Sequence, residues 1–147
     1  MKNATCNTMI LAAAALTFSV TTAFAQSTGK LKAEIPFSFH IGSQQYPAGT
    51  YETSVIGTNT GTKVLKIVNV ETGSPRVAMA SSNAYPRNAA SRESGARLVF
   101  QCVASDCALS QIWPGYSETG MQFRTPSAKS GEPMHLAVIR LRPTSAD

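Results

Sequence analysis

The sequence predicts an all-β protein, built as a small antiparallel β-sandwich or β-barrel of about seven to eight strands that follows a signal peptide. Three observations support this prediction. Short runs of alternating apolar and polar side chains recur beyond the first 25 residues, and Gly, Pro, Asn and Ser interrupt them. The same part of the chain contains no convincing amphipathic helix. Two cysteines, Cys102 and Cys107, lie between apolar runs at a spacing that suits one hairpin.

The N-terminus is typical of an export signal. Lys2 supplies a positive start, residues 9–20 form an apolar run, and residues 23–25 (Ala-Phe-Ala) supply a small-x-small cleavage site. We therefore predict a signal peptide over residues 1–25 and a single all-β domain over residues 26–147. The apolar run is shorter than the roughly 18–20 residues that cross a bilayer. We expect no membrane span after cleavage and an exported protein, either periplasmic or extracellular.

The first predicted strand covers residues 33–42. Its apolar side chains alternate with polar ones, so one face of the strand is apolar and the other is wet. The apolar face consists of Ile35, Phe37, Phe39 and Ile41. Pro36 cannot donate a backbone hydrogen bond, so we expect this strand to lie at a sheet edge or to begin near the proline. His40 falls on the polar face.

Three further strands are expected between residues 51 and 81. Pro-Ala-Gly at residues 47–49 predicts a turn, and a second alternating strand follows at residues 51–55. Residues 63–70 carry apolar side chains on both faces, which predicts a central strand that is covered on two sides. Residues 71–73 (Glu-Thr-Gly) then predict a tight hairpin that leads into a strand at residues 75–81.

The cysteine pair predicts a disulfide-linked hairpin, in which Cys102 faces Cys107 across a turn at residues 103–106. On one face the same register pairs Phe100 with Leu109 and Leu98 with Gln111. Register and apolar pattern agree in this arrangement. Because the closed loop is short, we expect the disulfide to stabilise the fold by only about 2 kcal/mol.

The remaining segments carry weaker signals. Residues 82–95 predict a long loop, or one short helical turn at residues 89–93. Residues 114–133 are rich in turn residues and leave room for a short strand at residues 121–124. The last strand is expected at residues 134–142, where a proline follows.

Residues that could carry chemistry are scattered. His40 and His135 lie far from the two cysteines, and this spacing matches no compact zinc site. The cysteine pair lacks the C-x-x-C turn of redox sites. No nucleophile elbow and no glycine-rich phosphate loop occurs. We therefore predict no catalytic residues, no metal, no cofactor and no enzymatic activity.

Charge and aromatic content narrow the expected partners. The chain has 13 Lys and Arg against 8 Asp and Glu, a net charge of +5, and its basic residues are dispersed. We therefore expect no nucleic-acid partner. Tyr85, Trp113 and Tyr116 lie in or beside predicted loops, where aromatic rings can stack on sugars or contact a partner. These three are the candidate ligand-binding residues, although core packing is the favoured role for Trp113.

Two stretches carry a resemblance. The sequences IPFSFHIGSQQYPAGTY (residues 35–51) and ARLVFQCVASDCALSQIWPG (residues 96–115) resemble an uncharacterised family of small exported bacterial β-rich proteins, which share PFxFxxG…PAGxY and LVF…LSQxW motifs. The resemblance implies an exported β domain and no particular reaction. The stretch after Gly120 departs most from the family pattern.

These observations lead to two functional hypotheses. The first is an exported non-enzymatic β domain with a structural or interaction role at the cell envelope, where the partner is an envelope component or another protein. The alternative is a small β-barrel that binds an apolar or carbohydrate ligand in its interior. An interior filled with side chains counts against the alternative.

Overall fold

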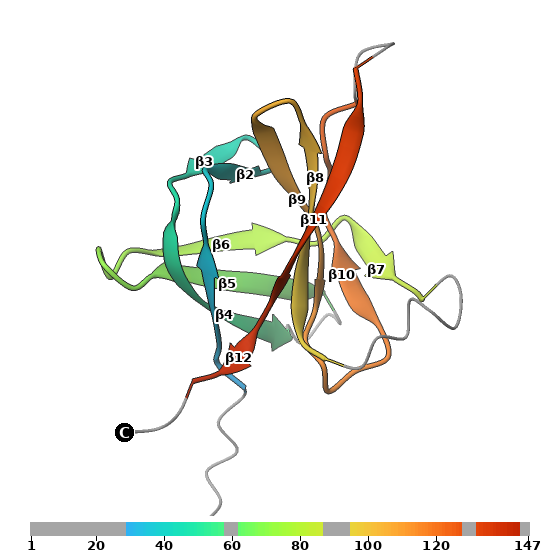
Figure 1. The fold of residues 1–147 in the computed structure, drawn as a ribbon. Coiled ribbons are helices and arrows are strands. Elements are labelled where there is room, and N and C mark those ends of the chain that lie inside the picture. The colour runs from blue at the N-terminus through green and yellow to red at the C-terminus, as the bar shows by residue number, and fades with distance from the viewer. Residues whose placement is uncertain (1–28, 58–61, 87–94, 128–131, 145–147) are drawn as a thin grey trace, which may run out of the picture.

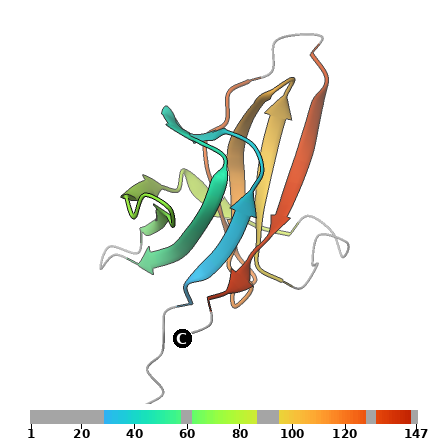
Figure 2. The same cartoon turned by 60° about the vertical axis from the view of Figure 1, so that its left-hand side comes forward.

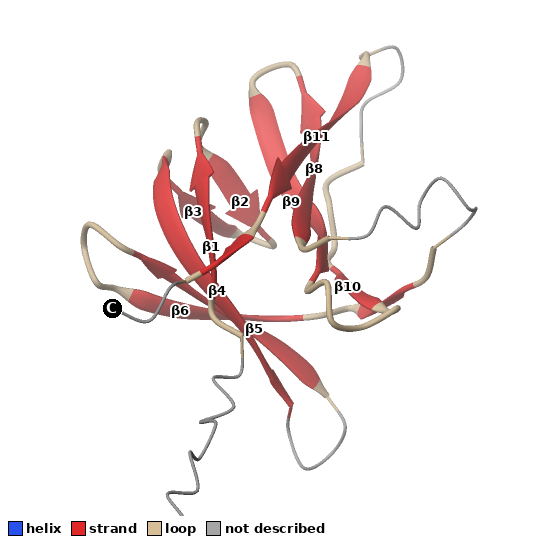
Figure 3. Ribbon diagram, turned by 60° about the horizontal axis from the view of Figure 1, so that its bottom comes forward, coloured by secondary structure: helices blue, strands red, loops and turns tan. Residues whose placement is uncertain are grey.

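The computed structural model describes residues 29–57, 62–86, 95–127 and 132–144. Within these ranges the chain forms strands and turns but no helix, as the sequence predicts (Figure 3). The strands are β1 (Leu31–Ile35), β2 (Phe39–Ile41), β3 (Gln44–Tyr46), β4 (Gly49–Gly57), β5 (Lys63–Asn69), β6 (Pro75–Met79), β7 (Ser82–Ala84), β8 (Arg97–Val103), β9 (Asp106–Trp113), β10 (Gly120–Gln122), β11 (Met134–Arg140) and β12 (Arg142–Pro143). None of the described residues forms a helix that could cross a membrane.

The strands form two sheets that enclose one apolar core (Figures 1 and 2). The first sheet has the order β12-β1-β4-β5-β6. The second has the order β11-β8-β9-β10-β7, with β2 paired to β9 and β3 paired to β2. Both sheets are open, since their described edge strands pair on one side only. A closed barrel is therefore wrong, and the arrangement fits the sandwich alternative.

The predicted strand at residues 33–42 is divided between the two sheets. β1 ends at Ile35 in the first sheet, and β2 begins at Phe39 in the second sheet. Pro36 lies directly after β1, where its missing N–H ends the hydrogen-bond ladder. β2 then runs parallel to β9, so the prediction of a purely antiparallel protein is wrong. The predicted alternation holds, because Ile35, Phe39 and Ile41 are all buried.

Aromatic rings from both sheets meet at the centre of the core. The Phe39 ring stacks on Tyr46 with centroids 5.1 Å apart, and it meets Tyr51 and Phe100 edge-on at 5.3 and 5.2 Å. Phe37 meets Phe100 edge-on at 5.2 Å. Such aromatic pairs stabilise by about 0.5–1.5 kcal/mol each beyond the burial of their area. Side chains thus fill the space that an interior ligand would need.

The β4–β5–β6 meander confirms the predicted turn chemistry but not the predicted burial. Gly73 has a φ of 64°, and its N–H donates to the Asn69 carbonyl at 2.8 Å. β5 lies between β4 and β6, as predicted, with Leu65 and Ile67 in the core. Its other face is only partly covered: Lys66 is exposed, and Val64 and Val68 are half-buried.

The disulfide hairpin forms as predicted near its turn. Cys102 and Cys107 are bonded with their Cα atoms 4.1 Å apart, and both are buried. Phe100 faces Leu109, as the register requires. The turn is tighter than expected, because β8 and β9 leave only two residues between them, and Ala104 adopts a positive φ of 52°.

Farther from the turn, the predicted register is wrong. A β-bulge leaves Ser110 without a partner on β8, so Gln111 faces Val99, and Leu98 faces Ile112 instead of Gln111. The Ser110 hydroxyl donates to the Val99 carbonyl at 2.9 Å, and the Ser110 carbonyl accepts the N–H of Phe123 at 2.9 Å. One extra residue reverses the faces of everything that follows on β9. The bulge therefore buries Ile112 in the core.

Several short strands were not predicted. β3, β7 and β12 have two or three residues each, too few for an alternation to show in sequence. The predicted loop at residues 82–95 begins with β7, and the predicted strand at residues 121–124 corresponds to β10. The last predicted strand is divided into β11 and β12. The signal peptide and the helical turn at residues 89–93 lie outside the described residues.

Candidate functional site

The structure places Trp113 on the outer face of the second sheet. The parity of β9 would place Trp113 on the same face as Leu109, but the bulge puts it on the opposite side, where it is buried with Val99 and Ala84. Its indole N–H donates to the Gln111 side-chain oxygen at 3.1 Å. The Arg97 guanidinium lies 4.9 Å from the ring centroid, within the range of cation–π attraction. Trp113 is thus enclosed by side chains of its own chain.

Tyr85 and Tyr116 differ from Trp113 in being strongly exposed. Tyr85 follows β7, and Tyr116 lies in the connection from β9 to β10. Ala84 pairs with Gly120, which joins β7 to β10. The structure therefore brings all three candidate aromatic residues to one end of the second sheet. A ligand-binding role for them stays a prediction.

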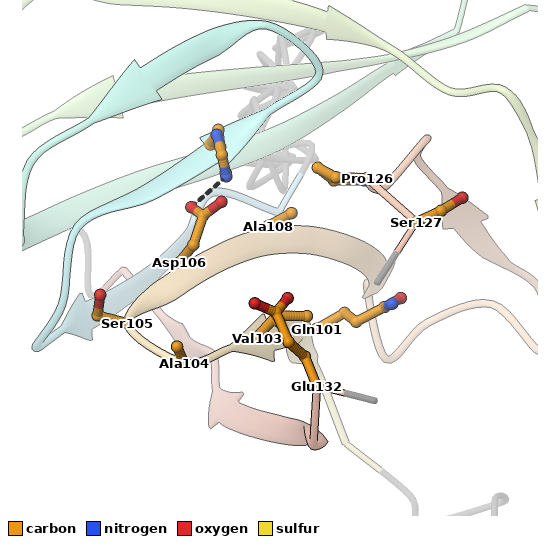
Figure 4. A pocket seen from close by; sticks show the side chains of 10 residues that line it. Gln101, Val103, Ala104, Ser105, Asp106, Ala108, Pro126, Ser127 and Glu132 are labelled. Atoms are coloured by element: carbon orange, nitrogen blue, oxygen red, sulfur yellow. Dashed lines mark ion pairs between the residues drawn. The ribbon is translucent and has the colours of Figure 1, made fainter. Parts of the chain in front are cut away.

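A polar hollow of about 370 Å³ lies beside the disulfide hairpin (Figure 4). His40, Asp106 and Glu132 contribute titratable groups to it, and His40 Nε2 lies 2.6 Å from Asp106 Oδ1. Gln101 accepts a hydrogen bond from the Thr125 hydroxyl at 3.0 Å. Within the described ranges, no three His, Cys, Asp or Glu side chains come together as a metal site. Among the titratable groups of the hollow, His40 and Asp106 thus lie against each other.

A second hollow, of about 450 Å³, follows one side of β6 and is called the β6 groove. Residues 77–79 of β6 form one wall, and the β2–β3 hairpin and Phe123–Arg124 form the other. Ile41, Tyr46 and Phe123 are buried at the base, whereas Val77 and Met79 are 63% and 71% exposed. β6 is the edge of its sheet, so one side of its backbone has no strand partner among the described strands.

The β6 groove is positively charged. Arg124 lines it, and no Asp or Glu does so in the described part of the chain. Arg76 lies beside it, with its guanidinium 5.5 Å from the Tyr46 ring centroid and 3.5 Å from the Gln44 side-chain oxygen. Burial raises the pKa of Tyr46, and the nearby Arg76 opposes that effect only in part. The groove therefore suits an anionic group next to an apolar one.

Sequence reasoning missed the β6 groove. The segment PRVAMAS was correctly predicted as a strand, but its exposed apolar residues, Val77 and Met79, look like core residues in sequence. The tyrosine and the arginines of the groove come from separate segments. The one sequence feature that could have indicated the groove is Arg76, which directly precedes the apolar run.

Comparison of the chain with protein-family models, with curated proteins and with solved structures gave no match.

Proposed function

We propose that this chain is an exported, non-enzymatic β domain that acts at the cell envelope by binding an extended segment of another protein in the β6 groove. The observation that carries the proposal is the groove itself. It combines an open strand edge, the exposed apolar side chains Val77 and Met79, and the arginines Arg76 and Arg124.

Each feature of the β6 groove selects for the same kind of occupant. An open strand edge offers backbone donors and acceptors, which an extended peptide satisfies by adding itself as a further strand. The apolar side chains favour an apolar residue in that peptide. The two guanidiniums, with no carboxylate in the described lining, favour an acidic residue beside it. The proposed partner segment is therefore extended, apolar and acidic.

Export is supported by two independent features. The N-terminal sequence has the pattern of a cleavable signal, and Cys102 and Cys107 are bonded in the structure. Disulfides persist in oxidising compartments and are rare in reducing ones. The resemblance to small exported bacterial β-rich proteins agrees with this location. Binding in a closed barrel interior lacks support, since the sheets are open and aromatic rings fill the core.

Site-specific photo-crosslinking in intact cells tests the binding site. A photoreactive residue replaces Met79 in one variant and the exposed Glu71, in the turn before β6, in a control variant. We expect a discrete adduct from position 79 only, mapping to an extended acidic segment of one envelope protein. The double substitution Arg76→Glu and Arg124→Glu should remove it. Identical adducts from both positions, or none at either, would reject the proposed site.

Fractionation of the same cells tests the location. We expect the chain outside the cytoplasm, with an intact mass that corresponds to cleavage after Ala25 and to an oxidised Cys102–Cys107 pair. An uncleaved cytoplasmic protein with free thiols would contradict export, whatever the crosslinking result.

A further inference from the structure

β11 is an open edge strand that exposes a row of apolar side chains. It ends the second sheet, and Figure 2 shows it as the outermost strand on the right. Ala137 and Ile139 turn toward the core. The alternate residues turn outward, so that Met134, Leu136 and Val138 are 53%, 63% and 52% exposed. Edges of this kind are usually protected by charges, prolines or a cover. Pro133 directly precedes β11, and from Met134 to Ile139 the strand has no proline, acid, lysine or arginine.

The outward side chains of β11 continue into charged residues at both ends. Glu132 precedes the apolar row and Arg140 ends it, and both are exposed. At every second position the outer face therefore reads acid, apolar, apolar, apolar, base. This order is self-complementary in an antiparallel pair of two copies. The acid of one strand faces the base of the other, and the apolar residues face each other.

We propose that β11 pairs antiparallel with β11 of a second copy of this chain, around a two-fold axis at Leu136. In this register Leu136 faces its own counterpart, Met134 faces Val138 of the second copy, and Glu132 faces Arg140 of the second copy. Directly opposed side chains in antiparallel strands lie close enough to interact. The contact uses the same patch on both chains, which closes the assembly as a dimer.

Other registers of the same two strands are less favourable. Parallel in-register pairing sets Glu132 against Glu132 and Arg140 against Arg140, and opposed like charges are destabilising. Moving the axis to Ala137 keeps the apolar residues on one face but sets Arg140 against Met134. Only the axis at Leu136 pairs every outward side chain of residues 132–140 with a suitable counterpart. This contact is independent of the β6 groove, which lies at the edge of the other sheet.

Cysteine substitutions report the register directly. Opposed Cα atoms lie about 4.5–5.5 Å apart in antiparallel pairs, within disulfide reach. Leu136→Cys should therefore form a disulfide-linked dimer under mild oxidation. In Val138→Cys the two new thiols are displaced by four residues, or about 13 Å, and should not link. An equimolar mixture of Met134→Cys and Val138→Cys chains should link across the two variants. Cys102 and Cys107 are already bonded to each other, and the third cysteine, Cys6, lies in the predicted signal peptide, so no other thiol competes in the cleaved protein.

Charge reversal tests the ends of the same register. Sedimentation of the wild-type chain should show a dimer, whose dissociation constant rises about tenfold or more in Glu132→Arg and in Arg140→Glu. The double variant Glu132→Arg with Arg140→Glu restores opposite charges and should return to nearly the wild-type value. Circular dichroism confirms that each variant remains folded, and Val77→Lys on the β6 edge should leave the dimer unchanged.

Three results would overturn this inference. The first is a wild-type chain that stays monomeric at millimolar concentration. The second is equal crosslinking by Leu136→Cys and Val138→Cys, which would indicate random collisions. The third is a failure of the double charge reversal to restore dimerisation. None of these results bears on the β6 groove, so the failure of one proposal can be told from the failure of the other.

Discussion

Substitution of Gly120 by Ala should destabilise the protein by steric conflict. Gly120 pairs with Ala84 across β10 and β7 and lies against the indole of Trp113. A Cβ at this position would lie 2.6 Å from the carbonyl oxygen of Ile112 and 2.9 Å from Cδ2 of Trp113. Neither neighbour can easily retreat, because Ile112 is held in the sheet and Trp113 is buried.

The expected magnitude follows from the cost of overpacking, which is about 1–3 kcal/mol for one added carbon in a packed site. The domain predicted over residues 26–147 has about 120 residues, so its unfolding entropy is about 0.25 kcal/mol/K near 60 °C. The melting temperature should then fall by about 4–12 °C. Gly57→Ala is the matched control, because a Cβ there meets nothing within 4 Å. That change should leave the stability unaltered, or raise it by about 0.4–1 kcal/mol because alanine lowers the conformational entropy of the unfolded chain.

Thermal unfolding followed by tryptophan emission is the appropriate assay. Trp113 is the only tryptophan, so the signal reports on the region that the added carbon disturbs. We expect a lower melting temperature and an altered native emission spectrum for Gly120→Ala, with neither change for Gly57→Ala. A Gly120→Ala protein that melts at or above the wild-type temperature would show that the close approach of β10 to Trp113 is wrong.

Three further predictions concern the core, the disulfide and pH. Phe100→Ala should lower the free energy of unfolding in urea by about 3–5 kcal/mol, since the ring is fully buried among aromatic neighbours; a loss under 1 kcal/mol would contradict that packing. Replacing Cys102 and Cys107 by Ala should cost about 2 kcal/mol and leave a folded protein, because the closed loop is short; complete unfolding would mean that the staple holds more than its hairpin. Burial raises the pKa of Tyr46 above 10.0, so the unfolded chain releases this proton first and stability should fall as the pH rises above about 10. Tyr46→Phe should weaken that alkaline loss in urea titrations at pH 9 and 11, and an unchanged loss would assign it to other groups.

Local patterns predicted the longer strands and the Gly73 turn correctly. Alternation along residues 33–42 placed Ile35, Phe39 and Ile41 on one buried face, even though the strand is divided between two sheets. Gly73 adopts the left-handed conformation that its hairpin requires. Both features depend on neighbours within a few residues, which is why sequence reasoning can reach them.

The bulge at Ser110 shows where local reasoning fails. Without it, the alternation from Leu98 to Gln111 looks regular, and the sequence offers no residue that demands an interruption. Ser110 is held out of register by the Val99 carbonyl and by the N–H of Phe123, which lies 13 residues further along the chain. Such a contact exists only once β8, β9 and the end of β10 have come together.

The candidate interaction surfaces depend on tertiary structure in the same way. The segments that form β6 and β11 were predicted as strands, and their apolar residues could equally have faced a core. The order of strands in each sheet makes both of them edges with one unpaired side, and their outer faces leave Val77, Met79 and Leu136 exposed.

The sequence by itself therefore determined that this protein is built from strands, that one hairpin carries a disulfide, and where several turns lie, because side-chain period and turn preference are properties of adjacent residues. Only the tertiary structure decided which apolar faces are buried and which remain open. Strand order joins segments that are distant in the chain, and no local pattern records which strand will have a neighbour on only one side.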